Sequence, residues 1–171
     1  MSFTGISQLI DRLNRGLGRA VSWLTFAMVV VMFVTVALRY FFDSGWIWLQ
    51  ESVTWMHAAV FLLAAAYTLA EDDHVRVDIF YRSMSPRGKA LVNTLGCLLF
   101  LLPFTGFLLW ISWEYVALSW SMQEASPESG GLAYPWVPLM KSFIPATAFL
   151  LLLQGIGMLF AALATLAGKD A

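Results

Sequence analysis

The chain has 171 residues, of which 60% are hydrophobic and only 12% are charged, and its formal net charge is −1. Soluble proteins carry about 25% charged residues, so this chain cannot cover its surface with polar groups and needs lipid as part of its solvent. The near-zero net charge gives no indication of a nucleic-acid partner. The single cysteine, Cys97, excludes an internal disulfide framework, a cysteine-rich metal site and a dithiol redox pair.

Residues 1–20 have an amphipathic pattern. Apolar residues recur at helical spacing while basic residues occupy other faces: Ile6, Leu9, Ile10, Leu13 and Leu17 against Arg12, Arg15 and Arg19. The pattern predicts a short cytoplasmic helix lying on the inner membrane leaflet. The alternative is an extension of the first membrane helix that packs on the chain itself.

Four segments are long and apolar enough to cross a bilayer, which takes about 20 residues of helix. They cover about residues 21–42, 47–70, 90–118 and 138–166, and residues 167–171 form a tail. The first is too long for a signal-peptide core, and no small-residue cleavage site follows it, so we expect it to be retained. Pro103 and Gly106 should kink the third segment, and Pro145 should bend the fourth. The sequence predicts an all-α membrane protein with four transmembrane helices.

Basic residues alternate between the segments that connect these helices. The N-terminal tail has three, the middle loop has four and the C-terminal tail has one, whereas the first and third connections have none. Because cytoplasmic loops are rich in Lys and Arg, both termini and the middle loop are predicted to be cytoplasmic. The basic residues are then expected to anchor the inner interface and are candidate contacts for a bound phospholipid. They are Arg12, Arg15, Arg19, Arg76, Arg82, Arg87 and Lys89.

The middle loop, about residues 71–89, has nearly balanced charges and several bulky apolar residues. It is either a solvated loop with interfacial anchors or a cytoplasmic docking surface. Ser85 followed by Pro86 is a favourable start for the third membrane helix, since serine caps helices and proline suits the first helical position.

Arg39 and Glu51 are charged residues inside apolar segments. Each lies about six residues from the turn near Ser44 and Gly45, roughly 9 Å along its helix, so the two are level in an antiparallel hairpin. An isolated arginine in the membrane costs about 2.5–3.5 kcal/mol on insertion scales. We therefore predict a structural ion pair between Arg39 and Glu51. The alternatives are a contact with another subunit and a proton-carrying or substrate-binding Glu51.

His57 and Gln154 are the other polar residues placed deep in the predicted helices. We expect both to be buried and to pack between helices or subunits, with Gln154 forming an interhelical hydrogen bond. The second histidine, His74, lies in the middle loop, so the chain does not supply both axial ligands of a bis-histidine haem. The sequence also has no phosphate-binding glycine loop and no nucleophile–base pair. It predicts neither an enzyme nor a metal or cofactor site.

Two stretches resemble the small membrane subunit, the DctQ-like small permease, of tripartite ATP-independent periplasmic (TRAP) transporters. The first is "WIWLQESVTWMHAAVFLLAAAYTLAEDDHVRVDIFYRSMSPRGKALV", with Trp46, Gln50–Glu51, Ala64–Ala66, His74, Arg76, Val77 and Asp78 in the family-like order. The second is "PESGGLAYPWVPLMKSFIPATAFLLLLQG", with Tyr134, Pro135, Trp136, Lys141, Pro145 and Leu153–Gly155. The resemblance runs from about residue 20 to 166. The family pattern has a Glu-Glu or Gln-Glu pair at this point, and here the pair is Gln50–Glu51. Only one carboxylate is present, so a two-carboxylate cation site is not expected.

The resemblance implies a subunit of a secondary, ion-gradient-driven, binding-protein-dependent uptake system for organic acids in the bacterial inner membrane. Its implied partners are a large multi-span transport subunit, which carries substrate and sodium, and a periplasmic substrate-binding protein. The small subunit would brace the large one as a membrane-fixed scaffold. Its outer loops are candidate contacts for the binding protein, through Asp43, Trp46, Trp48, Glu124, Glu128 and Trp136. The alternatives are a stand-alone proton-coupled transporter using Glu51 or Glu114, and the membrane anchor of a redox complex.

Overall fold

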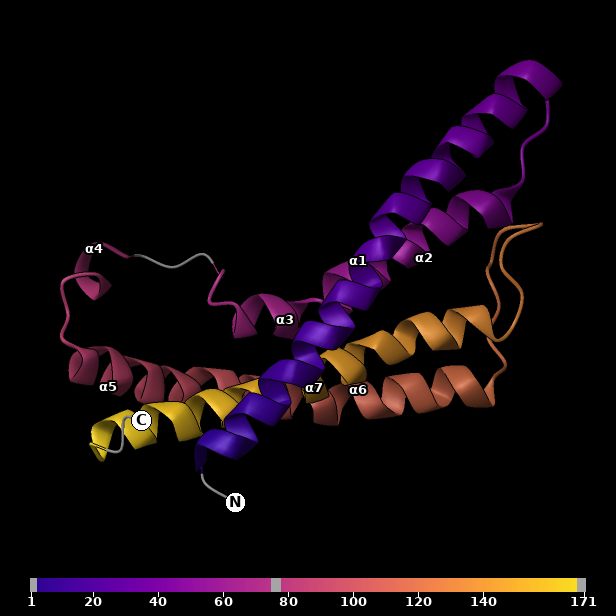
Figure 1. Ribbon diagram of the computed structural model, residues 1–171. Coiled ribbons are helices and arrows are strands. Elements are labelled where there is room, and N and C mark those ends of the chain that lie inside the picture. The colour runs from indigo at the N-terminus through magenta and orange to yellow at the C-terminus, as the bar shows by residue number, and fades with distance from the viewer. Residues whose placement is uncertain (1–2, 75–77, 169–171) are drawn as a thin grey trace.

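The computed structural model describes residues 3–74 and 78–168, and its regular structure in this range is entirely helical (Figure 1). The elements are α1 (Phe3–Phe42), α2 (Ile47–Leu63), α3 (Ala65–Ala70), α4 (Asp78–Tyr81), α5 (Pro86–Gly96), the π-helical turn η1 (Cys97–Leu101), α6 (Leu102–Ser121) and α7 (Trp136–Leu166). Four stretches are long and apolar enough to cross a membrane: Ser7–Phe42, Ile47–Ala70, Pro86–Ser121 and Trp136–Leu166. The predicted all-α fold with four membrane-spanning helices is confirmed. The orientation of its two ends stays a prediction.

The predicted surface helix and the first span form one continuous helix, α1. Its 40 residues span about 60 Å at 1.5 Å per residue, roughly twice the hydrocarbon thickness of a bilayer. Leu9 and Leu13 are more than half exposed, but Asn14 and Gly18 are buried inside the chain. The N-terminal segment is therefore an extension of the first membrane helix that packs on the chain itself, which was the alternative to a separate surface helix.

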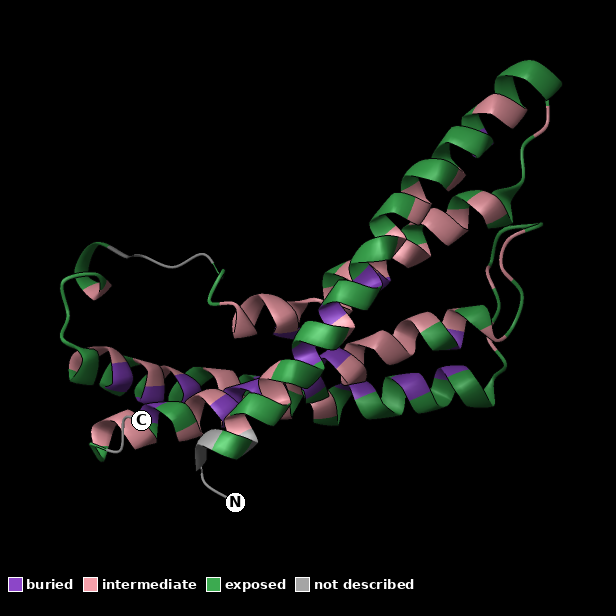
Figure 2. Ribbon diagram, viewed as in Figure 1, coloured by how far each residue is buried: buried purple, intermediate pink, exposed green. Residues whose placement is uncertain are grey.

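Helix α7 is the hub of the structure and contacts α1, α2, α3, α5 and α6. Helices α6 and α7 lie side by side, whereas the α1–α2 hairpin crosses α7 and projects away from this pair (Figure 1). Buried residues gather where α7 meets its neighbours, and the projecting part of α1 is largely exposed (Figure 2). In the most apolar windows of the four spans only 11% to 28% of the residues are buried. Most of the apolar surface is therefore left for lipid or for other proteins.

The third span is irregular near the predicted kink. Pro103 has no amide hydrogen, and its ring conflicts with the carbonyl group four residues earlier, at Leu99. The backbone there widens into the π-turn Cys97–Leu101, which is a known way to accommodate such a conflict. The helix begins as predicted, because the Ser85 hydroxyl accepts a hydrogen bond from the Gly88 amide and Pro86 follows at the first helical position.

The second span is interrupted at Ala64, where α2 ends and α3 begins. Ala66, on the α3 side of this break, is buried. Tyr67, the next residue, packs so closely on α1 that a Cβ atom at Gly18 would overlap its ring. Gly18 therefore permits the close crossing of α1 and α3.

We expect Gly18→Ala to lower the thermal stability of the purified protein, because the new methyl group forces the Tyr67 ring or the helix to move, at a cost of about 1–3 kcal/mol. Gly16→Ala is the matched control, since nothing lies within 4 Å of a Cβ at that position. It should be neutral or stabilise the helix by about 0.5–1 kcal/mol. Melting temperatures in one detergent compare the two variants, and equal values would contradict a tight crossing at Gly18.

Candidate functional site

The carboxylate of Glu51 holds the connection between α6 and α7, named the outer connection after its predicted side of the membrane, against the first turns of α2. It accepts hydrogen bonds from the Ser126 hydroxyl and, at 2.6 Å, from the backbone amide of Leu132. Ser126 and Leu132 are joined to each other by a backbone hydrogen bond of 2.9 Å. A Cβ at Gly131 would lie 2.9 Å from Glu51 Oε1, so only glycine lets the carboxylate approach this turn. Glu51 thus links α2 to residues 126–132.

The structure does not form the predicted ion pair between Arg39 and Glu51. Glu51 turns both carboxylate oxygens toward the α6–α7 connection, whereas Arg39 is exposed and lines a cavity of about 300 Å³ with Asp43, Ser44, Gly45 and Gln50. The two residues are level along the hairpin, but one residue turns a helix by about 100°. Gln50, not Glu51, therefore has the helical phase that places it beside Arg39.

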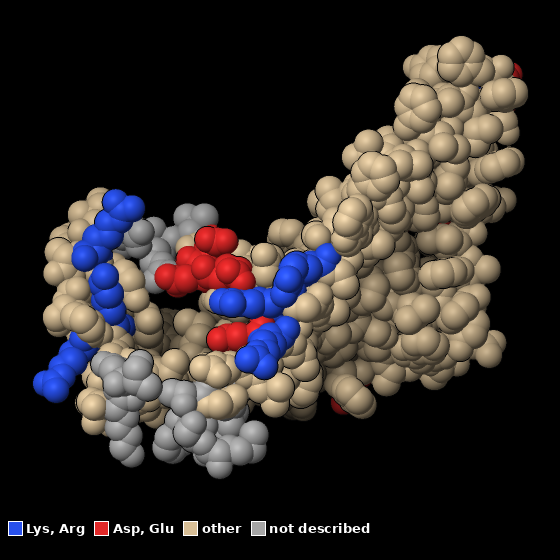
Figure 3. Space-filling view, in the orientation of Figure 1, with Lys and Arg blue, Asp and Glu red and all other residues tan. Residues whose placement is uncertain are grey.

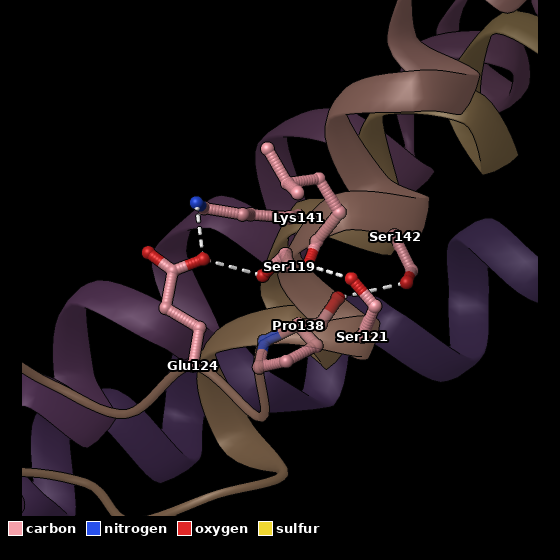
Figure 4. A network of polar contacts seen from close by, with 7 residues as sticks. Ser119, Ser121, Glu124, Pro138, Lys141 and Ser142 are labelled. Carbon is pink, nitrogen blue, oxygen red and sulfur yellow. Dashed lines mark hydrogen bonds and ion pairs between the residues drawn. The ribbon is translucent and has the colours of Figure 1, made fainter.

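A second polar network lies where α6 ends and α7 begins (Figure 4). The Lys141 amine forms a 2.6 Å ion pair with Glu124, and the Ser119 hydroxyl donates to the same carboxylate oxygen. Lys141 has only 16% of its side chain exposed, so Glu124 neutralises a largely buried charge. The hydrogen bonds from Lys141 and then from Ser119 lower the pKa of Glu124 below its ordinary value of 4.5. The carboxylate therefore stays ionised at neutral pH and ties the loop to both helices.

A third polar network joins the N-terminal part of α1 to the C-terminal half of α7. The Asn14 amide donates to the Gln154 carbonyl at 2.7 Å, and the Gln154 amide donates to Asp11 at 2.8 Å. Gln154 and Asn14 are 2% and 1% exposed, so the network replaces water for the Gln154 amide and for the Asn14 NH₂ group, whereas the buried Asn14 Oδ1 has no partner among the described residues. Arg15 forms a 2.8 Å ion pair with Glu71 nearby. Gln154 thus makes interhelical hydrogen bonds of the kind the sequence suggested.

His57 is not buried in this chain, contrary to our expectation. It is exposed on α2 and has no hydrogen bond to any residue in the described ranges. Its helical phase differs from that of Glu51 by six residues, or about 240°, and α2 meets the outer connection through the Glu51 side. Packing of His57 against another subunit stays a prediction.

Most candidate contacts in the outer loops are at the surface. Asp43, Trp46, Trp48, Glu128 and Trp136 are exposed. The rings of Trp46 and Trp48 stack at 5.9 Å, and Trp136 packs edge-on against Trp55 at 5.7 Å. Glu124 is only partly exposed, and its carboxylate forms an ion pair with Lys141.

Charged side chains gather at the opposite end of the molecule, over α4, α5 and the N-terminal part of α1 (Figure 3). Most of the predicted inner anchors are exposed there: Arg12, Arg15, Arg19, Arg82 and Arg87. Lys89 lies over the Tyr81 ring, 5.5 Å from its centre. Arg76 lies outside the described residues.

The sequence matches, over residues 28–165, the family described as the DctQ component of tripartite ATP-independent periplasmic transporters. The chain belongs to the DctQ family. It is a transporter component and not an enzyme, and its four apolar helices make it a multi-pass protein of the inner membrane.

A curated relative is the C4-dicarboxylate TRAP transporter small permease protein DctQ of Vibrio cholerae serotype O1 (strain ATCC 39315 / El Tor Inaba N16961). The two sequences are 28% identical over 116 residues, which cover 66% of this chain and 47% of the relative. The match thus spans about half of the length of that protein.

Several residues of the DctQ-family networks were not among the sequence candidates. Asn14 falls on the apolar face of the N-terminal pattern, four residues after Ile10 and three before Leu17, and a polar residue on an apolar face is a signal for an interhelical partner. Ser126 and Leu132 lie in a connection without periodicity, where the sequence gives no comparable signal.

We expect Glu51→Gln to loosen the outer connection of this DctQ-family subunit. Glutamine keeps one acceptor for the Leu132 amide, and the Ser126 hydroxyl can turn to accept from its NH₂ group, but neutral hydrogen bonds are about half as strong as those to a carboxylate. A protease that cuts after glutamate should then cleave at Glu128 faster than in the unmodified protein. Gln50→Ala is the control, since the Gln50 side chain does not touch the connection. Equal cleavage rates in the two variants would rule out the role of Glu51.

We expect the Asn14–Gln154 pair to be strongly coupled. Gln154→Leu or Asn14→Leu alone leaves a buried amide without its partner and should destabilise the protein by about 1–3 kcal/mol. Replacing both with leucine leaves neither amide of the pair without the other, although Asp11 still loses its Gln154 donor, so the double variant should be less destabilised than the sum of the single variants. Unfolding in detergent measures this cycle. Additive effects would show that the two side chains act independently.

Proposed function

We propose that this DctQ-family chain is the membrane-fixed scaffold of a secondary, ion-gradient-driven uptake system. It braces a large multi-span subunit that moves the substrate with sodium, and its outer loops help to dock a periplasmic substrate-binding protein. The substrates would be organic acids. Since the curated relative is named a C4-dicarboxylate transporter protein, C4-dicarboxylates are the first compounds to test.

The main support for this proposal is that few residues of the membrane-spanning helices are buried within the chain. At most 28% of the residues in their most apolar windows are buried within the chain, whereas a stand-alone carrier encloses a substrate between its own helices. The polar side chains at the three networks are used to join helices: Glu51 to a loop, Glu124 to Lys141 and Gln154 to Asn14. None of these groups is left to hold a substrate. This arrangement suits a support for another membrane protein.

The two outer connections support the docking role. Trp46 and Trp48 form a stacked, exposed aromatic pair beside the first connection. The second connection is held in shape by Glu51 and Glu124. It presents Glu128 to the surface. A fixed loop with exposed aromatic and acidic groups is a suitable contact surface, because little conformational freedom is lost on binding.

Reconstitution in proteoliposomes tests the proposal. We expect dicarboxylate uptake driven by a sodium gradient when the chain, the large subunit and the binding protein are all present, and none when the chain is alone or left out. Uptake or export by the chain alone would contradict the scaffold role and favour a proton-coupled transporter.

The same assay tests docking. Glu128→Lys should raise the concentration of binding protein needed for half-maximal uptake, without changing the melting temperature of the subunit. Arg87→Glu is the control, because Arg87 lies at the other end of the molecule. An equal effect of both substitutions would contradict a docking role for the second connection.

A further inference from the structure

One face of α2 carries exposed polar residues at helical spacing. Gln50, Thr54 and His57 stand at positions i, i+4 and i+7, so they lie on one side of the helix, and all three are exposed. Arg39 of α1 is also exposed and lines the same cavity as Gln50. We name Arg39, Gln50, Thr54 and His57 the polar stripe.

The polar stripe lies at membrane depth. His57 is ten residues after the first residue of α2, Ile47, which places it about 15 Å along the helix, or half of the hydrocarbon thickness of about 30 Å. Arg39 lies three residues before the end of α1 at Phe42. Ionisable residues at such depths face other protein groups or water-filled cavities and pair there. A lipid-facing polar stripe would be energetically unfavourable.

Within the described residues, no ion pair or side-chain hydrogen bond is formed by Arg39 or His57 of the polar stripe. Both carboxylate oxygens of Glu51, next to Gln50, accept hydrogen bonds from the outer connection. Asp43 lines the cavity with Arg39, yet within the described residues no ion pair joins the two. Asp43 also follows the last residue of α1, a turn nearer the membrane surface. Arg39 and His57 therefore lack partners in this part of the chain.

We propose that a transmembrane helix of the large transport subunit packs on the polar stripe. This inference rests on the proposed function. A partner segment inside the membrane is expected to be a helix, because a helix forms all of its backbone hydrogen bonds within itself. Charge complementarity requires a carboxylate opposite Arg39, and His57 requires a hydrogen-bonding side chain. Gln50 and His57 are seven residues apart, or about 10 Å. The partner helix should therefore carry its two polar side chains about two turns apart on one face.

Below His57 the same face turns apolar. Phe61 follows at the next helical position and is 73% exposed. The partner helix would thus meet polar groups near its outer end and an aromatic ring further in. This order fixes both the depth and the rotation of the partner, since a shift by one turn would place Arg39 against apolar side chains.

Site-specific crosslinking tests the surface. A photo-reactive phenylalanine analogue replaces Thr54 in the polar stripe or, as a control, Phe33, which is 73% exposed on another face of α1. Both chains are expressed with the large subunit and illuminated in membranes. We expect position 54 to crosslink to one transmembrane segment of the large subunit that carries a carboxylate, and position 33 to give less than about a tenth of that adduct. A crosslink between two copies of this chain, or to lipid only, would overturn the inference.

A charge exchange tests the role of Arg39. Arg39→Glu should reduce co-purification of the large subunit at least about tenfold, since a like charge opposes the partner carboxylate. Changing the mapped carboxylate to arginine should restore it. Arg19→Glu is the control: it lies on the same helix, twenty residues away and on nearly the opposite face. If Arg39→Glu and Arg19→Glu both retain the large subunit, the polar stripe is not the contact and the scaffold role stands. If the unmodified chain does not retain it either, both proposals fail.

Discussion

A polar side chain in a membrane helix requires a hydrogen-bonding partner, because lipid offers none. The structure depends on three polar networks near α7 that provide such partners. Glu51 holds the connection that leads into this helix, the Glu124–Lys141 pair ties that connection to the first turns of the helix, and the Asn14–Gln154 pair joins its later part to α1. Between these points the helices meet through small and apolar residues. In lipid such packing has little hydrophobic driving force. The polar contacts therefore add to the close packing of the helices and fix how α1 and the α6–α7 connection lie against α7.

The same requirement explains the difference between satisfied and exposed polar residues. Where α1 meets α7, Gln154 is paired on both sides, since it accepts from Asn14 and donates to Asp11. Where the α1–α2 hairpin projects from the bundle, Arg39 and His57 are exposed. Exposed ionisable groups in this position are what the proposed packing against a larger membrane subunit would cover. This agrees with the chain's membership of a family of transporter components.

The sequence predicts the four spans well because length and apolar composition are sufficient to define them. Proline chemistry likewise places the irregular turn before Pro103 and the start of α5 at Ser85 and Pro86. The partner of Glu51 was missed for a geometric reason, since being level in a hairpin does not fix the helical phase. The contact with Leu132 is made by a backbone amide in a loop. Such a donor cannot be predicted from the pattern of side chains in the sequence. Asn14 was visible on an apolar face, but its partner lies 140 residues away.

That long separation has a consequence for biosynthesis. The inner part of α1 emerges first from the ribosome, yet its hydrogen-bonding partner Gln154 belongs to the last helix to be made. Glu51 likewise lacks its hydrogen-bond donors until residues 126–132 have been synthesised. The first two spans must therefore remain in the membrane with unmatched polar groups while the rest of the chain is translated. These hydrogen bonds form only after α7 has been inserted, so the last helix to be synthesised completes the packing of the first.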